Sequence, residues 1–181
     1  MSNTLKVRRG TKANLPTLNS GEFGFTTDTN ELFIGNGATN CQVLTSIFQS
    51  PSATINSTGE SIVLTANEAQ AFGDVCYIGS DGKAHIAKAD AIANANAFVM
   101  CSDASIDSGN SGKYLVFGIA RKDTWSWTVS GFLYLSISGS TGNTLTQTAP
   151  SGTNNIVQIL GVALSSTTIF FNSCLVQIEL T

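Results

Sequence analysis

Apolar and polar side chains alternate along many short stretches of this chain, and turn-forming residues separate these stretches. Alternation with a period of two is typical of a β-strand that buries one face. The Gly, Asn, Asp and Ser residues between the stretches favour tight turns. The pattern therefore predicts an all-β protein with strands over residues 4–9, 22–26, 31–34, 74–78, 83–87, 97–101, 114–121, 131–136, 156–163, 167–171 and 175–180.

Residues 1–48 form the first predicted unit, a small β-hairpin module. Its two main strands are residues 22–26 and 31–34, and residues 27–30 form the turn between them. One hairpin in so short a segment cannot bury enough apolar area to fold alone. We therefore expect its large apolar side chains to contact another copy of the chain or another protein. These side chains are Phe23, Phe25, Leu32, Phe33 and Ile34.

A linker and a second domain are predicted after this module. Residues 49–61 are polar and contain Pro and Gly, so we interpret them as a linker. The turn-separated strands in residues 62–181 predict a β-sandwich or a small β-barrel. Within this domain, Asp81-Gly82 indicates a hairpin turn, and the Ala- and Asn-rich residues 89–97 predict one short helical turn. The apolar run over residues 156–163 predicts the central strand.

The composition agrees with this architecture. Only 12% of the residues are charged, and Ser, Thr, Asn and Gly together make up 74 of the 181 residues. An ordinary soluble domain has roughly a quarter charged residues. The deficit excludes a coiled coil or a helical bundle, which would need many Glu, Lys and Arg. The number of β-branched and aromatic residues excludes a charged disordered tail.

The charge is unevenly distributed along the chain. The first 20 residues contain four basic residues and no acidic one, whereas the remaining residues carry a net charge of −7. An acidic body argues against nucleic acid as a partner. Two interpretations of the basic stretch remain open: contact with an acidic surface on a neighbouring protein, or a solvated face that keeps a strand edge soluble. The basic residues are Lys6, Arg8, Arg9 and Lys12.

The sequence predicts neither membrane insertion nor secretion through a signal peptide. No run of about 18 apolar residues is present, and no apolar segment follows the basic N-terminus. We therefore expect synthesis in a cytoplasm. No C-x-x-C spacing suggests zinc or redox chemistry, and we expect the cysteines to be buried free thiols. They are Cys41, Cys76, Cys101 and Cys174.

No group of residues predicts catalysis, a metal ion or a cofactor. His85 is the one histidine, and no G-x-S-x-G motif is present. Asp103 and Asp107 lie in a Ser- and Gly-rich stretch that does not fit the calcium-loop pattern, so we interpret them as solvated turn residues. We therefore expect that the protein is not an enzyme.

Trp125 and Trp127 are the strongest candidates for ligand binding in the second domain. Their spacing would place both indole rings on one face of a strand. Paired aromatic rings of this kind could stack on sugar rings and bind a glycan. The alternative is burial in the core or at a subunit contact, where tryptophan is enriched.

The N-terminal motifs resemble those of a known kind of protein. The segment L-K-V-R-R-G-T over residues 5–11 is followed by L-N-S-G-E-F-G-F-T-T-D-T-N-E-L-F-I-G-N-G over residues 18–37. Together they resemble a short module near the N-terminus of bacteriophage tail-fibre and tropism-determinant proteins. The resemblance implies an intertwined homotrimer that anchors an appendage to the particle through other virion proteins of the capsid or tail.

The second domain carries a further resemblance. Its segments G-D-V-C-Y at 73–77, G-F-L-Y-L-S at 131–136 and V-Q-I-L-G-V-A at 157–163 resemble β-rich domains of phage head-fibre, capsid decoration and tail-fibre proteins. Both resemblances imply a structural protein of a bacteriophage virion, made in the host bacterial cytoplasm. The alternative is an adhesin that binds a glycan on the host surface. A depolymerase would need a cleft with two carboxylates, which we do not expect.

Overall fold

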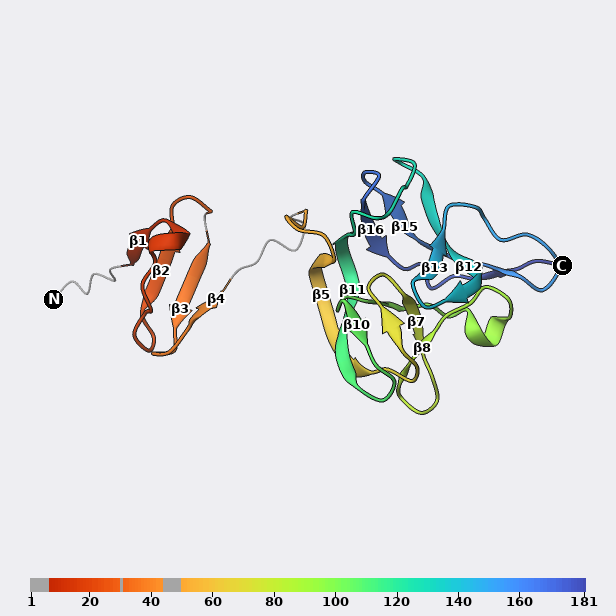
Figure 1. The fold of residues 1–181 in the computed structure, drawn as a ribbon, viewed down its shortest axis with the longest axis horizontal. Helices are drawn as coiled ribbons and strands as arrows, with labels where there is room; N and C mark the ends of the chain where they lie inside the picture. Colours follow the sequence, from red (N-terminus) through yellow and green to blue (C-terminus); the bar gives the residue numbers. More distant parts are fainter. Residues whose placement is uncertain (1–6, 30, 44–49) are drawn as a thin grey trace. The chain divides into compact units, whose positions relative to one another are not determined.

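The computed structural model describes residues 7–29, 31–43 and 50–181 (Figure 1). Strands make up nearly all of the regular structure, which confirms the predicted all-β class. The chain divides into two compact units, which we call the N-terminal unit (Met1–Ser46) and the C-terminal unit (Ile47–Thr181). Among the described residues, no helix is both long enough and apolar enough to cross a membrane.

The N-terminal unit is one four-stranded sheet with strand order β1-β2-β3-β4. β1 runs parallel to β2, and the other neighbouring pairs are antiparallel. The predicted hairpin is confirmed, because Phe23 pairs with Ile34 and Phe25 pairs with Leu32. The elements are β1 (Arg8–Gly10), the short 3-10 helix η1 (Lys12–Asn14), β2 (Phe23–Thr26), β3 (Leu32–Gly35) and β4 (Asn40–Gln42).

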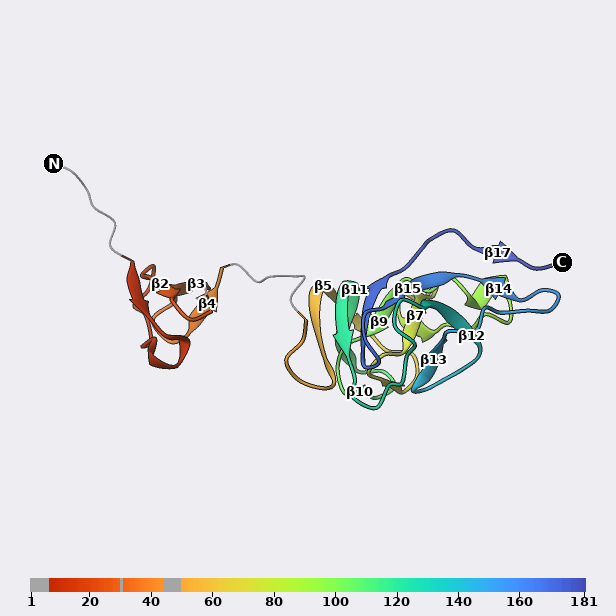
Figure 2. The same ribbon diagram turned by 90° about the horizontal axis from the view of Figure 1, so that it is seen from above.

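The C-terminal unit is built on one large sheet that curls into a nearly closed barrel (Figures 1 and 2). Its strand order is β13-β12-β15-β16-β11-β9-β7-β8, and β5 pairs with β11 outside this path. The strands are β5 (Asn56–Thr65), β6 (Gln70–Ala71), β7 (Val75–Ile78), β8 (Ala84–Ile86), β9 (Val99–Cys101), β10 (Ser105–Ile106), β11 (Ser111–Arg121), β12 (Phe132–Ser140), β13 (Asn143–Thr146), β14 (Ile156–Val157), β15 (Ile159–Ala163), β16 (Thr168–Asn172) and β17 (Ile178–Glu179). The fold therefore corresponds to the barrel rather than the sandwich.

The main core of this unit lies where the inward side chains of the barrel strands meet. Phe171 on β16 is fully buried, and it lies opposite Gly118 on β11 and Gly161 on β15. Both glycines have φ close to +150°, a conformation that side-chain-bearing residues rarely adopt. Other buried members of this core are Val75, Met100, Leu115, Leu133, Leu135, Leu160 and Ile169.

Two local predictions are confirmed. Gly79 and Gly82 close the turn between β7 and β8, since the Gly82 N–H donates to the Gly79 carbonyl. The Ala- and Asn-rich segment forms a single 3-10 turn, η2 (Ile92–Asn94).

The predicted linker over residues 49–61 is wrong for its second half. β5 begins at Asn56 and pairs with the full length of β11. Its Ser, Thr, Gly and Asn content suggested a linker, but β5 is an edge strand with much exposed surface, and polar residues are compatible with that position. Residues just before β5 are also held to the barrel, because the Arg121 guanidinium donates to the Pro51 and Ser52 carbonyls.

The predicted central strand over residues 156–163 is interrupted at Gln158. β15 does lie between β12 and β16, but β14 pairs with β17 instead. The Gln158 side chain is fully buried and forms hydrogen bonds with both the N–H and the carbonyl of Ala97. This anchoring accounts for the break. The strand predicted over residues 175–180 is reduced to the two residues of β17.

Candidate functional site

The described residues of the N-terminal unit leave one face of its sheet largely uncovered, and we call it the open face. Strand alternation places Phe23 and Phe25 of β2 on this face together with their partners Ile34 and Leu32 of β3. All four side chains are only half-buried. Arg9 pairs with Phe25, so it joins them, and Val7, Arg9, Phe25 and Leu32 line a shallow apolar hollow. Val43 lies beside Leu32 and is 45% exposed.

The opposite face of the same sheet is covered by the chain itself. The segment between β1 and β2 crosses this face and buries Leu18 completely. Phe33 lies between Leu32 and Ile34 on β3, so its side chain points to this covered side and is only 8% exposed. Phe33 was predicted to lie in the subunit contact, but the structure places it in the core of the N-terminal unit.

Two of the predicted basic residues form ion pairs within the N-terminal unit. The Arg8 guanidinium contacts the Glu22 carboxylate at 2.7 Å, and the Lys12 ammonium contacts the Glu31 carboxylate at 2.8 Å. Arg9 has no ion-pair partner among the described residues and borders the apolar hollow. Lys6 lies outside the described residues. Of the basic residues that the structure describes here, Arg9 is therefore the one available for an external acidic group.

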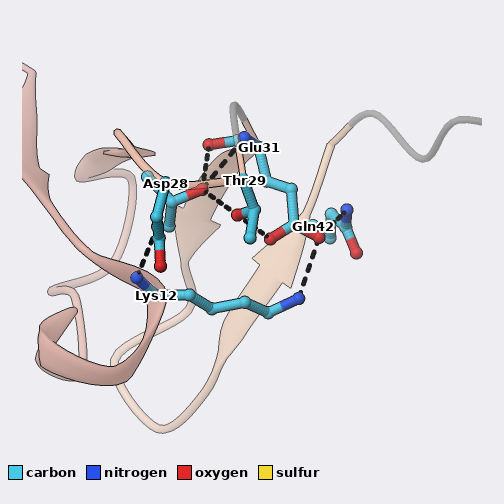
Figure 3. A network of polar contacts seen from close by, with 6 residues as sticks. Lys12, Asp28, Thr29, Glu31 and Gln42 are labelled. Atoms are coloured by element: carbon cyan, nitrogen blue, oxygen red, sulfur yellow. Dashed lines mark hydrogen bonds and ion pairs between the residues drawn. The ribbon is translucent and has the colours of Figure 1, made fainter. Parts of the chain in front are cut away.

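A polar network fixes the turn between β2 and β3 (Figure 3). Thr26 is fully buried, and its hydroxyl accepts a hydrogen bond from the Glu31 N–H at 2.9 Å. The Thr29 hydroxyl lies 2.6 Å from that of Thr26 and donates to the Glu31 carboxylate. The Asp28 carboxylate accepts from the Lys12 N–H at 2.9 Å, which ties the turn to η1. The network supports the hairpin that presents the open face.

The sequence predicts this turn but not the network. Asp and Asn predicted a turn through their general backbone preferences. The contribution of Lys12 comes from a position far earlier in the chain, so spacing alone gave no indication of it. Thr26 and Thr29 were the available signal, because Thr hydroxyls often bond to nearby backbone groups.

Acid is expected to destabilise the N-terminal unit. Hydrogen bonds from Asn19 and Arg8 hold the pKa of Glu22 below its ordinary value of 4.5, and those from Lys12 and Thr29 do the same for Glu31. A lowered pKa in the folded state contributes stability above the unfolded pKa. This contribution is lost as the pH falls through the lowered pKa.

We therefore expect NMR cross-peaks of β2 and β3 to weaken when the pH is lowered from neutral to about 2.5, as the carboxylates are protonated. Glu31→Gln should reduce this pH dependence, since it removes one of the two titrating groups. Folded cross-peaks of equal intensity throughout the titration would contradict the prediction.

Trp125 and Trp127 do not lie on a strand, contrary to expectation. They lie in the irregular segment between β11 and β12 and are half-buried against the main core. The Phe72 and Trp125 ring centroids are 6.0 Å apart, and those of Trp125 and Trp127 are 5.8 Å apart. With Asn143 they border a small hollow. Packing in the core therefore accounts for most of their surface.

His85 and Asp103 have structural partners. The His85 ring stacks on Tyr77 and lies 3.0 Å from the Asp81 carboxylate. Asp103 accepts a hydrogen bond from the Lys113 N–H. Among the described residues, no group of three His, Cys, Asp or Glu side chains is arranged to hold a metal ion.

The cysteines differ in their surroundings, although none of the four forms a disulfide. Cys76 and Cys101 are buried as expected, and burial raises the pKa of both thiols, to about 12 for Cys101. A raised pKa makes a thiol unreactive at neutral pH. Cys41 and Cys174 are exposed, which corrects the expectation that all four thiols are buried.

The open face, the covered face and the turn network all lie within one short segment of the chain. Residues 5–39 match the major tropism determinant N-terminal domain. This match supports the interpretation of the chain as a virion-associated phage structural protein of the tropism-determinant or tail-fibre type. The match ends before β4, so it does not include the C-terminal unit. No curated protein and no solved structure gave a significant match to the chain.

Proposed function

We propose that this chain is a non-enzymatic structural protein of a bacteriophage particle and that it assembles as a homotrimer. The N-terminal unit joins the copies and attaches them to other virion proteins of the capsid or tail. The C-terminal unit forms a head-fibre, decoration or tail-fibre domain. The observation that carries this proposal is the open face, where Phe23, Phe25, Leu32 and Ile34 remain half-exposed on one side of a small sheet.

Identical copies provide the simplest cover for the open face. Soluble proteins that remain monomeric rarely expose a large contiguous apolar patch, and closed cyclic symmetry buries the same patch on every copy. The threefold number is taken from the resemblance of this segment to tropism-determinant modules. The covered face supports the assignment, because the N-terminal unit already has its own core around Leu18 and Phe33.

Attachment to the particle would use the charge at the border of the open face. The Arg9 guanidinium has no ion-pair partner among the described residues, whereas Arg8 and Lys12 are paired. A carboxylate on a neighbouring virion protein could form a bidentate pair with Arg9.

Glycan binding through Trp125 and Trp127 is the less supported function. Both rings pack against the core, so little of either ring is available for stacking on a sugar. The described residues also offer no arrangement that favours hydrolysis: His85 and Asp103 have structural partners, and no metal-binding group is formed.

The proposal predicts that charge on the open face dissociates the assembly. In the double variant Phe25→Asp/Leu32→Asp, carboxylates would have to be buried between subunits, which is strongly unfavourable. We expect light scattering after size-exclusion chromatography to give three chain masses for the wild type and one for this variant.

A control separates this effect from added charge alone. Ala13 and Thr17 are exposed residues of the same unit in the segment between β1 and β2, so Ala13→Asp/Thr17→Asp adds the same charge away from the open face. This control should keep the wild-type mass. A wild-type chain that is monodisperse with the mass of one copy at micromolar concentration would refute the homotrimer.

A further inference from the structure

A hollow lies on the C-terminal unit beside the place where β12 and β13 separate, and we call it the hydroxyl hollow. β12 pairs with β13 at Leu135 and pairs with it again only at Ser140, and the register shifts between these two positions. The hollow is lined by residues 136–138 of β12, by Thr146 at the end of β13 and by residues 148–151 of the following loop. Its volume is about 210 Å³.

Hydroxyl groups dominate the lining of the hydroxyl hollow, and no lining residue is charged. Each hydroxyl can donate one hydrogen bond and accept two, so the lining can match donors and acceptors of a ligand without a counter-charge. The hydroxyl-bearing residues are Ser136, Ser138, Thr146, Thr148 and Ser151.

Much of this hydrogen-bonding capacity is unused within the described part of the chain. Thr148 and Ser151 are exposed, and each makes its hydrogen bond through the backbone, so their hydroxyls have no partner among the described residues. The Thr146 hydroxyl accepts from the Thr148 N–H at 3.1 Å, and the Ser136 hydroxyl accepts from the Ser138 N–H at 3.3 Å. Accepting one bond leaves each of these hydroxyls further capacity.

The remaining lining residues are apolar and lie between the hydroxyls in sequence. Ile137 is 39% exposed, Ala149 is exposed and Pro150 is buried. A purely apolar ligand would leave the surrounding hydroxyls without partners, which is unfavourable. A charged ligand would find no opposite charge in the lining. A sugar ring carries hydroxyls on its rim and C–H groups on its faces, so it matches both parts of this surface.

The size of the hydroxyl hollow limits the ligand, and its walls are fixed by contacts within the unit. Sites for drug-sized ligands occupy about 300–1,000 Å³, so this smaller hollow suits a single sugar ring. The Ser136 carbonyl accepts from the Ala89 N–H at 3.0 Å. The Gln147 side chain bonds to both the N–H and the carbonyl of Thr128, at 2.8 Å each. A preformed wall reduces the entropy lost on binding.

We propose that the hydroxyl hollow binds one ring of a neutral carbohydrate. The hydroxyls of Thr148 and Ser151 bond to the sugar hydroxyls, and Ile137 and Ala149 contact its C–H groups. This site is separate from Trp125 and Trp127. It goes beyond the proposed structural role, and it does not depend on self-association because all its lining residues belong to one C-terminal unit.

The test is saturation-transfer difference NMR on the full chain with D-glucose, D-galactose and D-mannose as probes. We expect at least one of them to bind with a dissociation constant on the order of millimolar, since a single ring offers few contacts. Thr148→Val removes one hydroxyl at nearly constant size and should weaken binding by about threefold or more. Thr124→Val is the matched control, because Thr124 is an exposed residue of the same unit outside the lining, and it should leave the affinity unchanged.

A second variant occupies the hydroxyl hollow instead of removing a hydrogen bond. Ala149 is exposed, so Ala149→Phe should place a ring in the hollow and abolish binding with an unchanged melting temperature. Absence of saturation transfer to all three sugars at tens of millimolar would overturn the inference. Binding that is unchanged in both Thr148→Val and Ala149→Phe would overturn it as well.

The outcome is distinguishable from that of the proposed homotrimer. A wild-type chain that has the mass of one copy and binds a sugar sensitive to Thr148→Val would refute the homotrimer and support the hydroxyl hollow. A chain with three chain masses that binds none of the sugars would do the reverse.

Discussion

Replacing Gly161 with alanine is expected to lower the free energy of unfolding of the C-terminal unit by about 3 kcal/mol or more. Gly161 has φ = +154°, and a Cβ atom built there would lie 2.0 Å from the Phe170 carbonyl oxygen. That oxygen belongs to the neighbouring strand β16. The clash can therefore be relieved only if β15 and β16 separate. Phe171, the fully buried partner of Gly161, would lose its packing as a result.

A second glycine separates the backbone strain from the steric clash. Gly142 also has a positive φ, +82°, but a Cβ atom there would meet nothing within 4 Å. Gly142→Ala should therefore cost only about 1 kcal/mol, which is the strain alone. Urea unfolding followed by tryptophan fluorescence measures both variants, because both Trp residues lie in this unit. Equal losses in the two variants would show that the close approach of β15 and β16 does not matter.

The same glycines explain part of what the sequence could not predict about the fold. Period-two alternation identified the hairpin of β2 and β3 and most of the barrel strands, because these strands bury one face. It failed for β5, whose Gly59 lies opposite Gly118 of β11 at a close backbone approach. Gly suggests a turn or linker when the partner strand is unknown, and the partner here is far away in sequence.

The candidate site was predicted more completely than the strand order. The alternation that predicted β2 and β3 also places Phe23, Phe25, Leu32 and Ile34 on one face. The same rule places Phe33 on the other face. The prediction that Phe33 lies in the subunit contact was therefore wrong, although the alternation in the sequence already separates it from Leu32 and Ile34. The sequence did not show that the segment around Leu18 covers that other face, since this is a tertiary contact.

Leu18→Ala is expected to unfold the N-terminal unit and abolish assembly. Leu18 is completely buried, and its side chain fills the space above Gly24 and Gly35, where added Cβ atoms would lie within 3 Å of Leu18. Truncating a buried leucine to alanine costs about 2–5 kcal/mol. A unit of this size has little stability in reserve, so a loss of this order leaves a substantial unfolded fraction.

The effect on assembly follows from the position of Leu18 on the covered face. It cannot contact another copy through the open face, so any loss of assembly must come through unfolding of the sheet. Val43→Ala supplies the contrast, because Val43 is 45% exposed beside Leu32 and its truncation should weaken assembly while the sheet stays folded. Amide hydrogen exchange of β2 and β3 should become fast in Leu18→Ala and stay slow in Val43→Ala, with light scattering reporting the mass of each. Slow exchange and an unchanged mass in Leu18→Ala would mean that the sheet does not depend on this core. The open face would then have to be stabilised by contacts outside its own unit.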